Sequence, residues 1–451
     1  MGATRSLSEF AVRTTFDRLP TEVVRESKRC ILNYLGVALG AADHQAVRLL
    51  METIAEEGGK RQATVLGHGR RCSAIQAATI NGTMSHVLDY DDTHLPTVIH
   101  PTGPVLSAAL ATAEWKGLSG RELIAALATG MEVELRVGSA VYPAHYDVGW
   151  HITGTAGTFG AAAAVGKLLQ LSEEQMTHAL GMAGAQAAGL REMFGSMTKA
   201  LHVGKAASNG LLSAMLATRG FTASTEVLEG RRGFCAVTAS EYDLGQITVG
   251  LGDEYLMLQN GIKPYACGVV THPTIDGVRR LRERYRLAPN DVLEIETKIH
   301  PLVRELTGKK SPRTGLEGKF SIYFCAAIAL IEGNARESQF TDEKVNRPDV
   351  IALMDRVRAQ VEPGVLEDQA VVSIRTVDGR ILVERVEAAT GTPNNPMPDD
   401  QLMEKYLELS TRILPRDRAE QLAEQVAHME KMEDPSGILE AATLRRRTGA
   451  K

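Results

Sequence analysis

The sequence is poor in aromatic residues and cysteines, and these shortages exclude several classes of protein. Aromatic residues make up only 5% of the 451 residues, so small side chains must fill much of the core. The five cysteines lie far apart and form no CxxC pair, which argues against a structural zinc site and a disulfide framework. Reduced thiols in a cytoplasmic protein fit this pattern best.

Long hydrophobic runs and an excess of positive charge are also missing. No stretch reaches the roughly 18 uninterrupted apolar residues of a membrane span, and the N-terminus has no apolar signal core. The formal net charge is -5, from 50 basic and 55 acidic residues. We therefore predict neither a membrane nor a nucleic acid as partner. The absence of GxxxxGK[ST] and GxSxG motifs also excludes P-loop and α/β-hydrolase chemistry.

The length and the hydrophobic pattern favour two domains, the first of them helical. From residue 7 to about 260, apolar residues recur at helical spacing. Ser119 with Glu122 and Ser172 with Gln175 have the spacing of capping boxes, which open helices. Residues 155–171 and 178–190 are dominated by glycine and alanine, which predicts helices that approach one another closely in a central bundle.

The pattern changes near Lys263. Residues 292–301 alternate like a strand, and residues 370–389 read as a hairpin with a type I′ turn at Asp378-Gly379. Helical patterns end at Gly333 and span 347–362, and helical spacing returns from about 401 to 433. We predict a mainly α fold with an inserted α+β domain: an all-helical domain of residues 1–262 and 401–451, interrupted by an α+β domain of residues 263–400.

The stretch from His86 to His100 holds three carboxylates and three histidines in fifteen residues. If its first half is helical, His86, Asp89 and Thr93 share one face, Asp91 and Asp92 point elsewhere, and a loop after Pro96 brings His100 to the same place. Local caps and satisfied core histidines are the plainer alternative. The adjacent aspartates lack the alternation of a calcium loop, so the pattern does not favour a metal site.

Three further segments carry charged or titratable groups. His151 precedes a Thr-Gly-Thr run that opens a helix, whose N-terminal amides suit a carboxylate. Cations gather in residues 189–210, where a polyanionic ligand or solvent must satisfy them: Arg191, Lys199, His202 and Lys205. Residues 261–277 contribute Lys263, Tyr265, Cys267 and His272, either to a site or as ordinary linker residues.

Taken in order, several segments closely resemble the MmgE/PrpD family. They include "SHVLDYDDTHLPTVIHPTGPVLSAALATAE", "HITGTAGTFGAAAAVGKLLQLSEEQMTHALGMAGAQAAGL", "TKALHVGKAASNGLLSAMLATRGFT" and "KPYACG". The family contains 2-methylcitrate dehydratase, cis-aconitate decarboxylase and iminodisuccinate epimerase. The resemblance covers essentially the whole chain. It implies an all-helical core domain in two pieces, a smaller α/β lid domain, a homodimer, and no metal or organic cofactor.

The family's reactions share a carbanion next to a carboxylate of a small di- or tricarboxylate. Such a reaction needs a base, an acid and cations. Similarity to the cis-aconitate decarboxylase site implies six corresponding residues here: Asp89, Thr93, His100, His151, Lys199 and Lys263. We assign proton transfer to the two histidines, orientation of a histidine to Asp89, and carboxylate binding to the two lysines. Arg191 is added as a carboxylate clamp, because its guanidinium matches a carboxylate bidentately.

One position departs from the family pattern. The dehydratases and decarboxylases of the family have a histidine shortly after the lysine that corresponds to Lys263. This chain has Tyr265-Ala266-Cys267-Gly268 at that place. Cys267, His272 or Tyr146 are the candidates to replace it as an acid.

Three hypotheses of function follow from these residues. A hydro-lyase of the 2-methylcitrate dehydratase type leads. An epimerase of the iminodisuccinate type is the alternative that the missing histidine favours, since it needs two bases and no acid for a leaving group. A non-catalytic polycarboxylate-binding protein is the third, and the intact pair of His100 and His151 argues against it.

Overall fold

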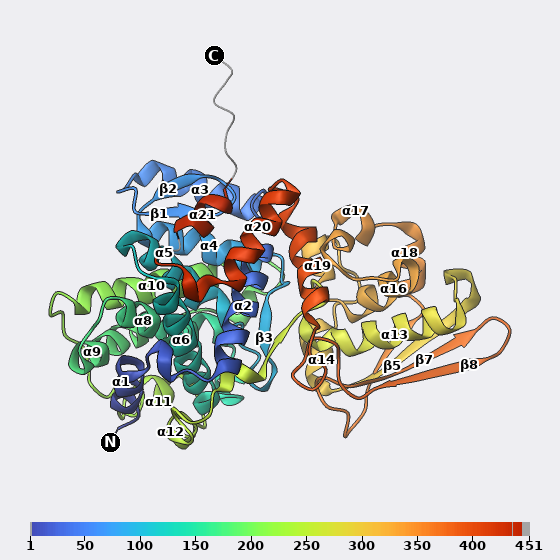
Figure 1. Cartoon of the computed structure of the whole chain (residues 1–451). Coiled ribbons are helices and arrows are strands. Elements are labelled where there is room, and N and C mark those ends of the chain that lie inside the picture. Colours follow the sequence, from blue (N-terminus) through green and yellow to red (C-terminus); the bar gives the residue numbers. More distant parts are fainter. Residues whose placement is uncertain (1, 435, 444–451) are drawn as a thin grey trace, which may run out of the picture. The chain divides into compact units, whose positions relative to one another are not determined.

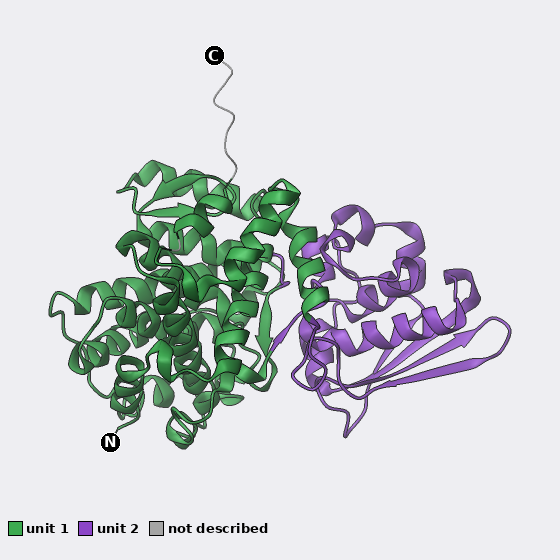
Figure 2. Ribbon diagram, in the orientation of Figure 1, with its two compact units in different colours: residues 1–87, 91–260, 399–451 green, residues 88–90, 261–398 purple. Residues whose placement is uncertain are grey.

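The computed structural model describes residues 2–434 and 436–443, and the chain divides into two compact units. The larger unit comprises residues 1–87, 91–260 and 399–451, and the smaller comprises residues 88–90 and 261–398 (Figures 1 and 2). The larger unit is mainly helical and the smaller one combines helices with a sheet, which confirms the predicted fold class. Within the described residues, none of the helices has the length and apolar character required to cross a bilayer.

Helices dominate the larger unit. Its α-helices are α1 (Ala3–Arg13), α2 (Thr21–Gly40), α3 (Gln45–Glu57), α4 (Ala74–Val87), α5 (Thr102–Lys116), α6 (Gly120–Val141), α7 (Ala144–Val148), α8 (Ile152–Leu168), α9 (Glu173–Gly184), α10 (Met197–Ala217), α11 (Phe234–Thr238), α12 (Gly245–Thr248), α19 (Asp399–Ser410), α20 (Arg416–Ala427) and α21 (Ser436–Ala441). Both predicted capping boxes are present, at Ser119 before α6 and at Ser172 before α9.

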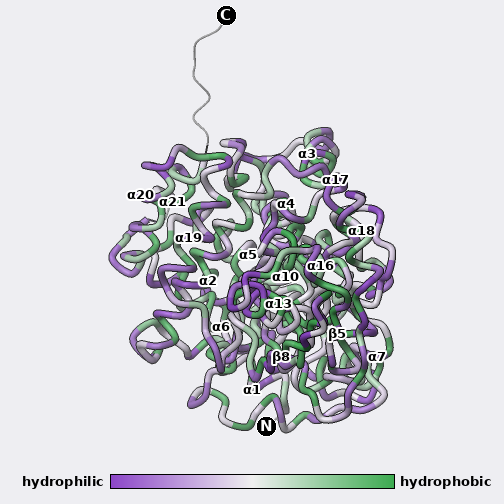
Figure 3. The backbone as a smooth tube through the Cα atoms, turned by 90° about the vertical axis from the view of Figure 1, so that its right-hand side faces the viewer, coloured by the Kyte–Doolittle hydropathy of each residue, from purple (hydrophilic) through white to green (hydrophobic). Residues whose placement is uncertain are grey.

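Glycines let the central helices α4, α6, α8 and α10 approach closely. A Cβ atom on Gly204 of α10 would lie 2.2 Å from the carbonyl oxygen of Thr79 on α4, and one on Gly82 of α4 would lie 2.8 Å from the Cα atom of Gly204. A Cβ atom on Gly130 of α6 would likewise lie 2.7 Å from the carbonyl oxygen of Gly160 on α8. The predicted close bundle is confirmed. In Figure 3 the tube is mostly white and green along α4, α5 and α10, whereas purple, hydrophilic stretches mark outer helices such as α20.

Short strands interrupt the helices of the larger unit, which the prediction of an all-helical domain missed. Strands β1 (Ala63–Val65) and β2 (Arg70–Cys72) form an antiparallel hairpin, and β3 (Asp92–His94) follows α4. Three residues are too few to show the alternation of a strand in the sequence. The condition that the first half of the stretch from His86 to His100 is helical is not met, because α4 ends at Val87 and Asp89 has a left-handed φ of 50°.

The smaller unit contains a four-stranded sheet in the order β6-β5-β7-β8. Its strands are β5 (Val292–Ile299), β6 (Val357–Val361), β7 (Ala370–Thr376) and β8 (Ile381–Val386); β6 is parallel to β5 and the other pairs are antiparallel. Its α-helices are α13 (His272–Tyr285), α14 (Pro301–Thr307), α15 (Gly315–Gly318), α16 (Ile322–Glu332), α17 (Asp342–Val345) and α18 (Pro348–Met354), and β4 spans Asn260–Ile262. Helix α13 packs on the sheet, where a Cβ atom on Gly277 would lie 2.6 Å from the side chain of Val372.

Several predicted features of this unit are present and three need correction. The hairpin at 370–389 exists, but its turn is not type I′, because Asp378 does not have the positive φ that this turn requires and only Gly379 does (φ 87°). The helix that starts at Pro348 ends at Met354, and the rest of its predicted range is strand β6. Finally, the predicted domain boundaries omitted residues 88–90, which cluster with the smaller unit.

Candidate active site

A buried pair of histidine and aspartate lies where α4 ends. His86 is in the last turn of α4, and its Nδ1 atom is 2.6 Å from Oδ2 of Asp91, which follows after the chain has left the helix. Both side chains are buried. The prediction that Asp91 points elsewhere was therefore wrong, since this carboxylate is hydrogen-bonded to a histidine. An aspartate on Nδ1 orients an imidazole and directs its Nε2 atom toward other groups.

The backbone of the same segment fixes the ring of His100. The Nδ1 atom of His100 lies 2.8 Å from the carbonyl oxygen of Asp92 and 3.0 Å from the hydroxyl oxygen of Thr93. A carbonyl oxygen can only accept, so these partners assign the proton of the neutral ring to Nδ1 and the lone pair to Nε2. The amide of His100 donates to the hydroxyl of Thr153 (3.1 Å), which ties this loop to the first turn of α8.

His151 is the residue immediately before α8, as the sequence predicts. Its amide donates to the carbonyl oxygen of Gly189 (2.9 Å), and its Nδ1 atom lies 3.0 Å from Nδ1 of His202 on α10. Burial, together with the positive charge of nearby groups such as Lys199, holds the pKa of His151 well below its usual range. The ring is therefore neutral at physiological pH. Lys199, in the first turn of α10, is buried and lies over the ring of Phe194 (5.1 Å to the centroid).

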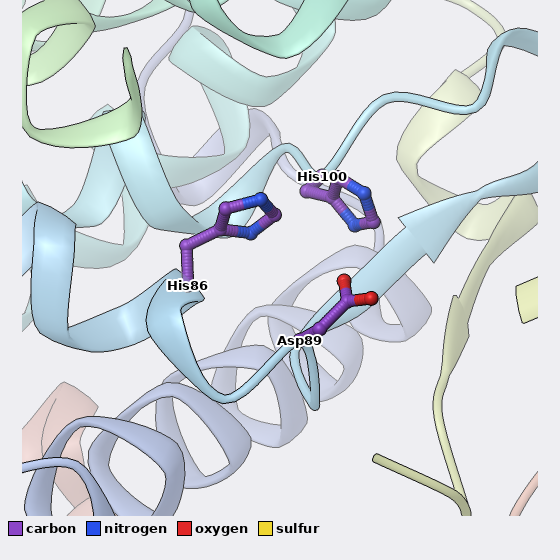
Figure 4. A group of neighbouring side chains, drawn as sticks. All are labelled: His86, Asp89 and His100. Atoms are coloured by element: carbon purple, nitrogen blue, oxygen red, sulfur yellow. The ribbon is translucent and has the colours of Figure 1, made fainter. Parts of the chain in front are cut away.

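These side chains form one group inside the larger unit, which we call the histidine group: His86, His100, His151 and His202. The ring of His86 lies between two others, with centroids 4.7 Å from His100 and 5.8 Å from His151. Figure 4 shows the elements that carry His86 and His100, with Asp89 on the segment that follows α4. Imidazoles beside a buried lysine can move protons next to an anionic group.

Asp92 supports the same segment from its other side. Its Oδ2 atom accepts hydrogen bonds from the hydroxyl of Thr102 and from Nδ2 of Asn260, both at 2.6 Å. Burial, and then repulsion by Asp91, raise the pKa of Asp92 to about 6. Asp92 is thus a buried carboxyl whose hydrogen bonds fix the strand that carries Thr93.

Asp89 belongs to the three-residue segment that clusters with the smaller unit. Its Oδ1 atom accepts from Nζ of Lys263 at 2.9 Å, and both side chains are buried. The hydroxyl of Tyr90 donates to the carbonyl oxygen of Pro264 (2.9 Å), and Nζ of Lys319 donates to the carbonyl oxygens of Leu88 (2.5 Å) and Ala266 (2.8 Å). This clamp, formed by Lys263, Tyr90 and Lys319, holds the left-handed backbone of Asp89, a conformation that costs energy in a residue other than glycine.

The candidates that follow Lys263 form a second buried cluster in the smaller unit. Sγ of Cys267 lies 3.2 Å from the hydroxyl of Thr271, and Nε2 of His272 lies 3.4 Å from the carbonyl oxygen of Cys267. Burial opposes ionisation of Cys267, but its hydrogen bonds with Cys325 and His272 outweigh burial and lower the pKa of the thiol. Tyr265 is occupied elsewhere, since its hydroxyl lies between Asp276 (2.5 Å) and Arg279 (2.7 Å).

The last two predicted residues, Arg191 and Tyr146, contact each other. The guanidinium of Arg191 lies 4.0 Å from the ring centroid of Tyr146 and donates to its carbonyl oxygen at 2.8 Å. Arg191 is half-buried, and Tyr146 is buried in α7, which precedes His151 in the chain. These contacts hold the guanidinium in place near α7.

A separate groove of about 870 Å³ lies on the larger unit between the loop at Pro96 and the loop after Ser240. Its lining includes three acidic residues and two tyrosines: Asp147, Glu241, Asp243, Tyr142 and Tyr242. No lysine or arginine is among the described residues that line it. A groove with this charge repels a polycarboxylate, so we do not assign the substrate to it.

The histidine group also contains atoms that could ligate a metal ion. Two imidazoles and a carboxylate, those of His86, His100 and Asp89, have ligand atoms within 4.8 Å of one another, and such a donor set binds transition metals. The Nδ1 atom of His86 faces the carboxylate of Asp91 and that of His100 faces the carbonyl oxygen of Asp92, so a metal ion would have to bind the Nε2 atoms. The same arrangement, with Nδ1 held by a carboxylate or a carbonyl, also suits proton transfer.

Sequence reasoning missed Lys319, ruled out Asp91, and named His202 only as one of the cations of residues 189–210. His202 lies three residues after Lys199 on α10, so helical spacing could have joined the two. Asp91 was left out of the predicted site because a helix through this segment would turn its side chain away, whereas α4 ends at Val87. Lys319 is buried at the start of the apolar run of α16, and a lone lysine beside such a run was the available signal.

Comparisons with known proteins extend over most of the chain. Residues 5–246 match the MmgE/PrpD N-terminal domain and residues 265–431 match the MmgE/PrpD C-terminal domain. The cis-aconitate decarboxylase of Aspergillus terreus is 28% identical over 97% of this chain and 95% of its own length. The human cis-aconitate decarboxylase is 27% identical over 93% of this chain and 90% of its own length, and the mouse enzyme is 28% identical over 93% and 89%. With both domain models matched in order along the chain, this protein belongs to the MmgE/PrpD family.

Proposed function

We propose that the protein is a lyase that acts on a small tricarboxylate through a carbanion next to one of the carboxylates. The observation that carries the proposal is the buried histidine group, with Lys199 beside it. The relatives named cis-aconitate decarboxylase support a tricarboxylate as the substrate class. We assign proton transfer to His100 and His151, and binding of the substrate's carboxylates to Lys199, Lys263 and Arg191.

Removal of a proton from carbon requires a neutral base that is already in place. His100 offers a lone pair on Nε2 because its Nδ1–H is held by the carbonyl oxygen of Asp92. His151 is neutral because of its burial, and its Nε2 atom is buried without a hydrogen-bond partner among the described residues. A buried base with an unpaired nitrogen is costly unless a ligand uses it.

Elimination of water is our first expectation among the lyase reactions, as in 2-methylcitrate dehydratase. Such an elimination begins with abstraction of a proton, and the neutral ring of His151 suits that step. Decarboxylation of cis-aconitate needs an acid for the carbanion and no base, so it uses the histidine group less fully. The candidates for the acid that either reaction requires are Cys267, His272 and Tyr146; because the pKa of Cys267 is lowered, its thiolate would have to take up a proton before it could act as an acid.

Epimerisation is the second candidate, and the sequence after Lys263 favours it. No histidine occurs in "KPYACG", and Cys267 is fully buried against Thr271. An epimerase removes a proton from one face of a carbon and returns one to the opposite face, so it needs two bases and no acid for a leaving group. Iminodisuccinate is the substrate by which we test this candidate.

The deciding experiment is proton NMR of the purified protein in D2O with 2-methylcitrate, citrate, cis-aconitate and iminodisuccinate. A new alkene signal from 2-methylcitrate or citrate supports the hydro-lyase, and loss of CO2 from cis-aconitate supports the decarboxylase. Deuterium in a recovered substrate or its epimer, with no alkene, supports the epimerase. Failure of all four compounds to react or exchange would overturn the proposed chemistry.

His151→Ala separates an enzyme from a binding protein. We expect turnover to fall at least about 100-fold, the usual contribution of a general base, while affinity for the tricarboxylate measured by calorimetry changes little. His178→Ala is the matched control, because His178 is a half-buried histidine of α9 whose Nδ1 atom lies 3.0 Å from the carbonyl oxygen of Ala223. Unchanged turnover in His151→Ala would refute the role assigned to this residue.

A further inference from the structure

We propose that His202 is a positioning residue that sets the tautomer of His151 and exchanges its proton with solvent. This inference rests on the proposed function, because it matters for catalysis only if His151 transfers a proton. The contact that carries it is the 3.0 Å approach of the two Nδ1 atoms. At this distance one imidazole must donate and the other must accept, since two lone pairs or two protons would repel.

The surrounding backbone makes room for this contact. Gly189 has a φ of 145°, and a Cβ atom there would lie 3.3 Å from Nδ1 of His202 and 3.4 Å from Cβ of His151. A Cβ atom on Gly154, in the first turn of α8, would lie 3.2 Å from Cβ of His202. Glycine at both places lets α10 bring His202 against His151. His151 is also held by the hydrogen bond that its backbone N–H donates to the carbonyl oxygen of Gly189.

The protonation of one ring determines that of the other. Burial is the main cause that lowers the pKa of His202 to about 4, with the charges of His86 and Lys199 adding to it, and burial also lowers the pKa of His151. Both rings are therefore neutral near pH 7, and each carries one proton. If His151 donates through Nδ1, its Nε2 atom is a base; if His202 donates, the Nε2 atom of His151 carries the proton and is an acid.

A proton can thus cross the pair without leaving a charge on the buried ring. The C–H bond of the substrate breaks and its proton binds Nε2 of His151, while the electron pair stays on the carbon as the carbanion. The proton on Nδ1 of His151 moves to Nδ1 of His202, and the proton on Nε2 of His202 leaves to water. Both rings end neutral, and His151 now carries a proton on Nε2 with which it can act as an acid.

Exposure differs between the two rings in the direction that this route requires. His151 is 2% exposed, so water does not reach it directly, whereas His202 is half-buried. The groups that face the pair are His86 and Lys199, together with His100 on the side of His151. All of these disfavour a second positive charge, so a proton held on His151 is driven outward through His202.

The experiment compares wild type with His202→Leu and His202→Asn. Asparagine keeps a polar atom near the position of Nδ1, whereas leucine removes it. Long-range 15N–1H NMR spectra of the 15N-labelled protein report which ring nitrogen of His151 is protonated, with its signals assigned from their loss in His151→Gln. We expect one tautomer in wild type, averaged nitrogen shifts in His202→Leu, and a single tautomer again in His202→Asn.

Kinetics and a control variant complete the test. With whichever compound of the panel reacts, we expect kcat to fall at least about tenfold in His202→Leu with KM nearly unchanged, and to recover partly in His202→Asn. His178→Leu, on α9, should change neither quantity. Identical His151 spectra in wild type and a folded His202→Leu would overturn the inference. If no compound reacts, the proposed function fails and the spectra still decide whether His202 sets the tautomer.

Discussion

Replacement of Lys319 by methionine tests whether the buried clamp on residues 88–90 works as described. Burial, partly opposed by the carboxylates of Glu337 and Asp89, lowers the pKa of Lys319 from 10.5 to about 8. The unfolded chain therefore binds the lysine proton more tightly than the folded chain. Below pH 8 folding carries the whole cost of burying the ammonium, about 3 kcal/mol, and this cost disappears as the pH rises from 8 to 10.5.

Methionine has no such proton, so the two proteins should differ in how their stability depends on pH. Between pH 7 and pH 9.5 the free energy of unfolding of wild type should rise by about 2 kcal/mol relative to Lys319→Met. Urea unfolding at both pH values measures this difference. The variant also leaves the carbonyl oxygens of Leu88 and Ala266 without their donor, which costs about 1–3 kcal/mol for each buried group. We expect turnover to fall as well, because Asp89 follows Leu88.

Lys167→Met is the matched control for this experiment. Burial lowers the pKa of Lys167 to about 8, and its Nζ atom donates to the carbonyl oxygen of Ala11 at 3.2 Å, far along the chain from residues 88–90. The free energy of unfolding of wild type should rise with pH relative to Lys167→Met by a similar amount, because the pKa shift is of the same size, and turnover of this variant should not change. Parallel pH dependences of wild type and Lys319→Met would refute the linkage argument, and full activity of Lys319→Met would refute the clamp.

Four further predictions concern helix packing, two other buried side chains and the metal requirement. Gly204→Ala should cost about 1–3 kcal/mol of stability and also reduce turnover, because its Cβ atom would lie 2.2 Å from the carbonyl oxygen of Thr79 and push α4, with His86, away from α10. Thermal unfolding measures the loss of stability. The control is Gly437→Ala, whose Cβ atom would have no neighbouring atom closer than 3.8 Å. Burial lowers the pKa of His94 to about 4, so between pH 7 and pH 5 wild type should lose about 2 kcal/mol more stability than His94→Gln in urea unfolding. Cys267→Ala should lower kcat about tenfold or more if the thiol is the acid, whereas Cys235→Ala, which removes a buried cysteine of α11 in the larger unit, should not, and equal activity of both variants would remove Cys267 from the mechanism. Dialysis against EDTA should leave turnover unchanged, and activity that returns only with an added metal ion would contradict the cofactor-independent mechanism.

Local patterns in the sequence were sufficient for the helical character of the larger unit and for the starts of α6 and α9. The capping boxes at Ser119 and Ser172 are satisfied by residues three positions away, so they can be read without knowing the rest of the chain. The glycines of residues 155–171 and 178–190, which include parts of α8 and α9, likewise predicted close helix packing. Strand β6 could not be found in this way, because it is fixed by parallel pairing with β5, about sixty residues earlier, and its own residues also suit a helix.

The candidate site, too, could be predicted only as far as it depends on residues close together in the sequence. The residue types and spacing from His86 to His100 indicated proton transfer, and the resemblance to a family indicated which positions to name. The partners of these residues could not be predicted, because they depend on where α4 ends. That end is set by Lys263 and Lys319, more than 170 residues later, which hold Asp89 in its left-handed conformation. The contact between His151 and His202 likewise joins residues fifty-one positions apart.

The assignment of residues 88–90 to the smaller unit limits how this protein can be divided into fragments. A fragment of residues 261–398 would have continuous sequence and its own sheet, yet it would lack the three residues that contact Lys263, Pro264 and Lys319. Lys263 would then lose the carboxylate of Asp89, and Lys319 would lose the carbonyl oxygen of Leu88 and keep only that of Ala266. Such a fragment should fold poorly or expose these cations, and a peptide that carries Leu88-Asp89-Tyr90 should restore its stability.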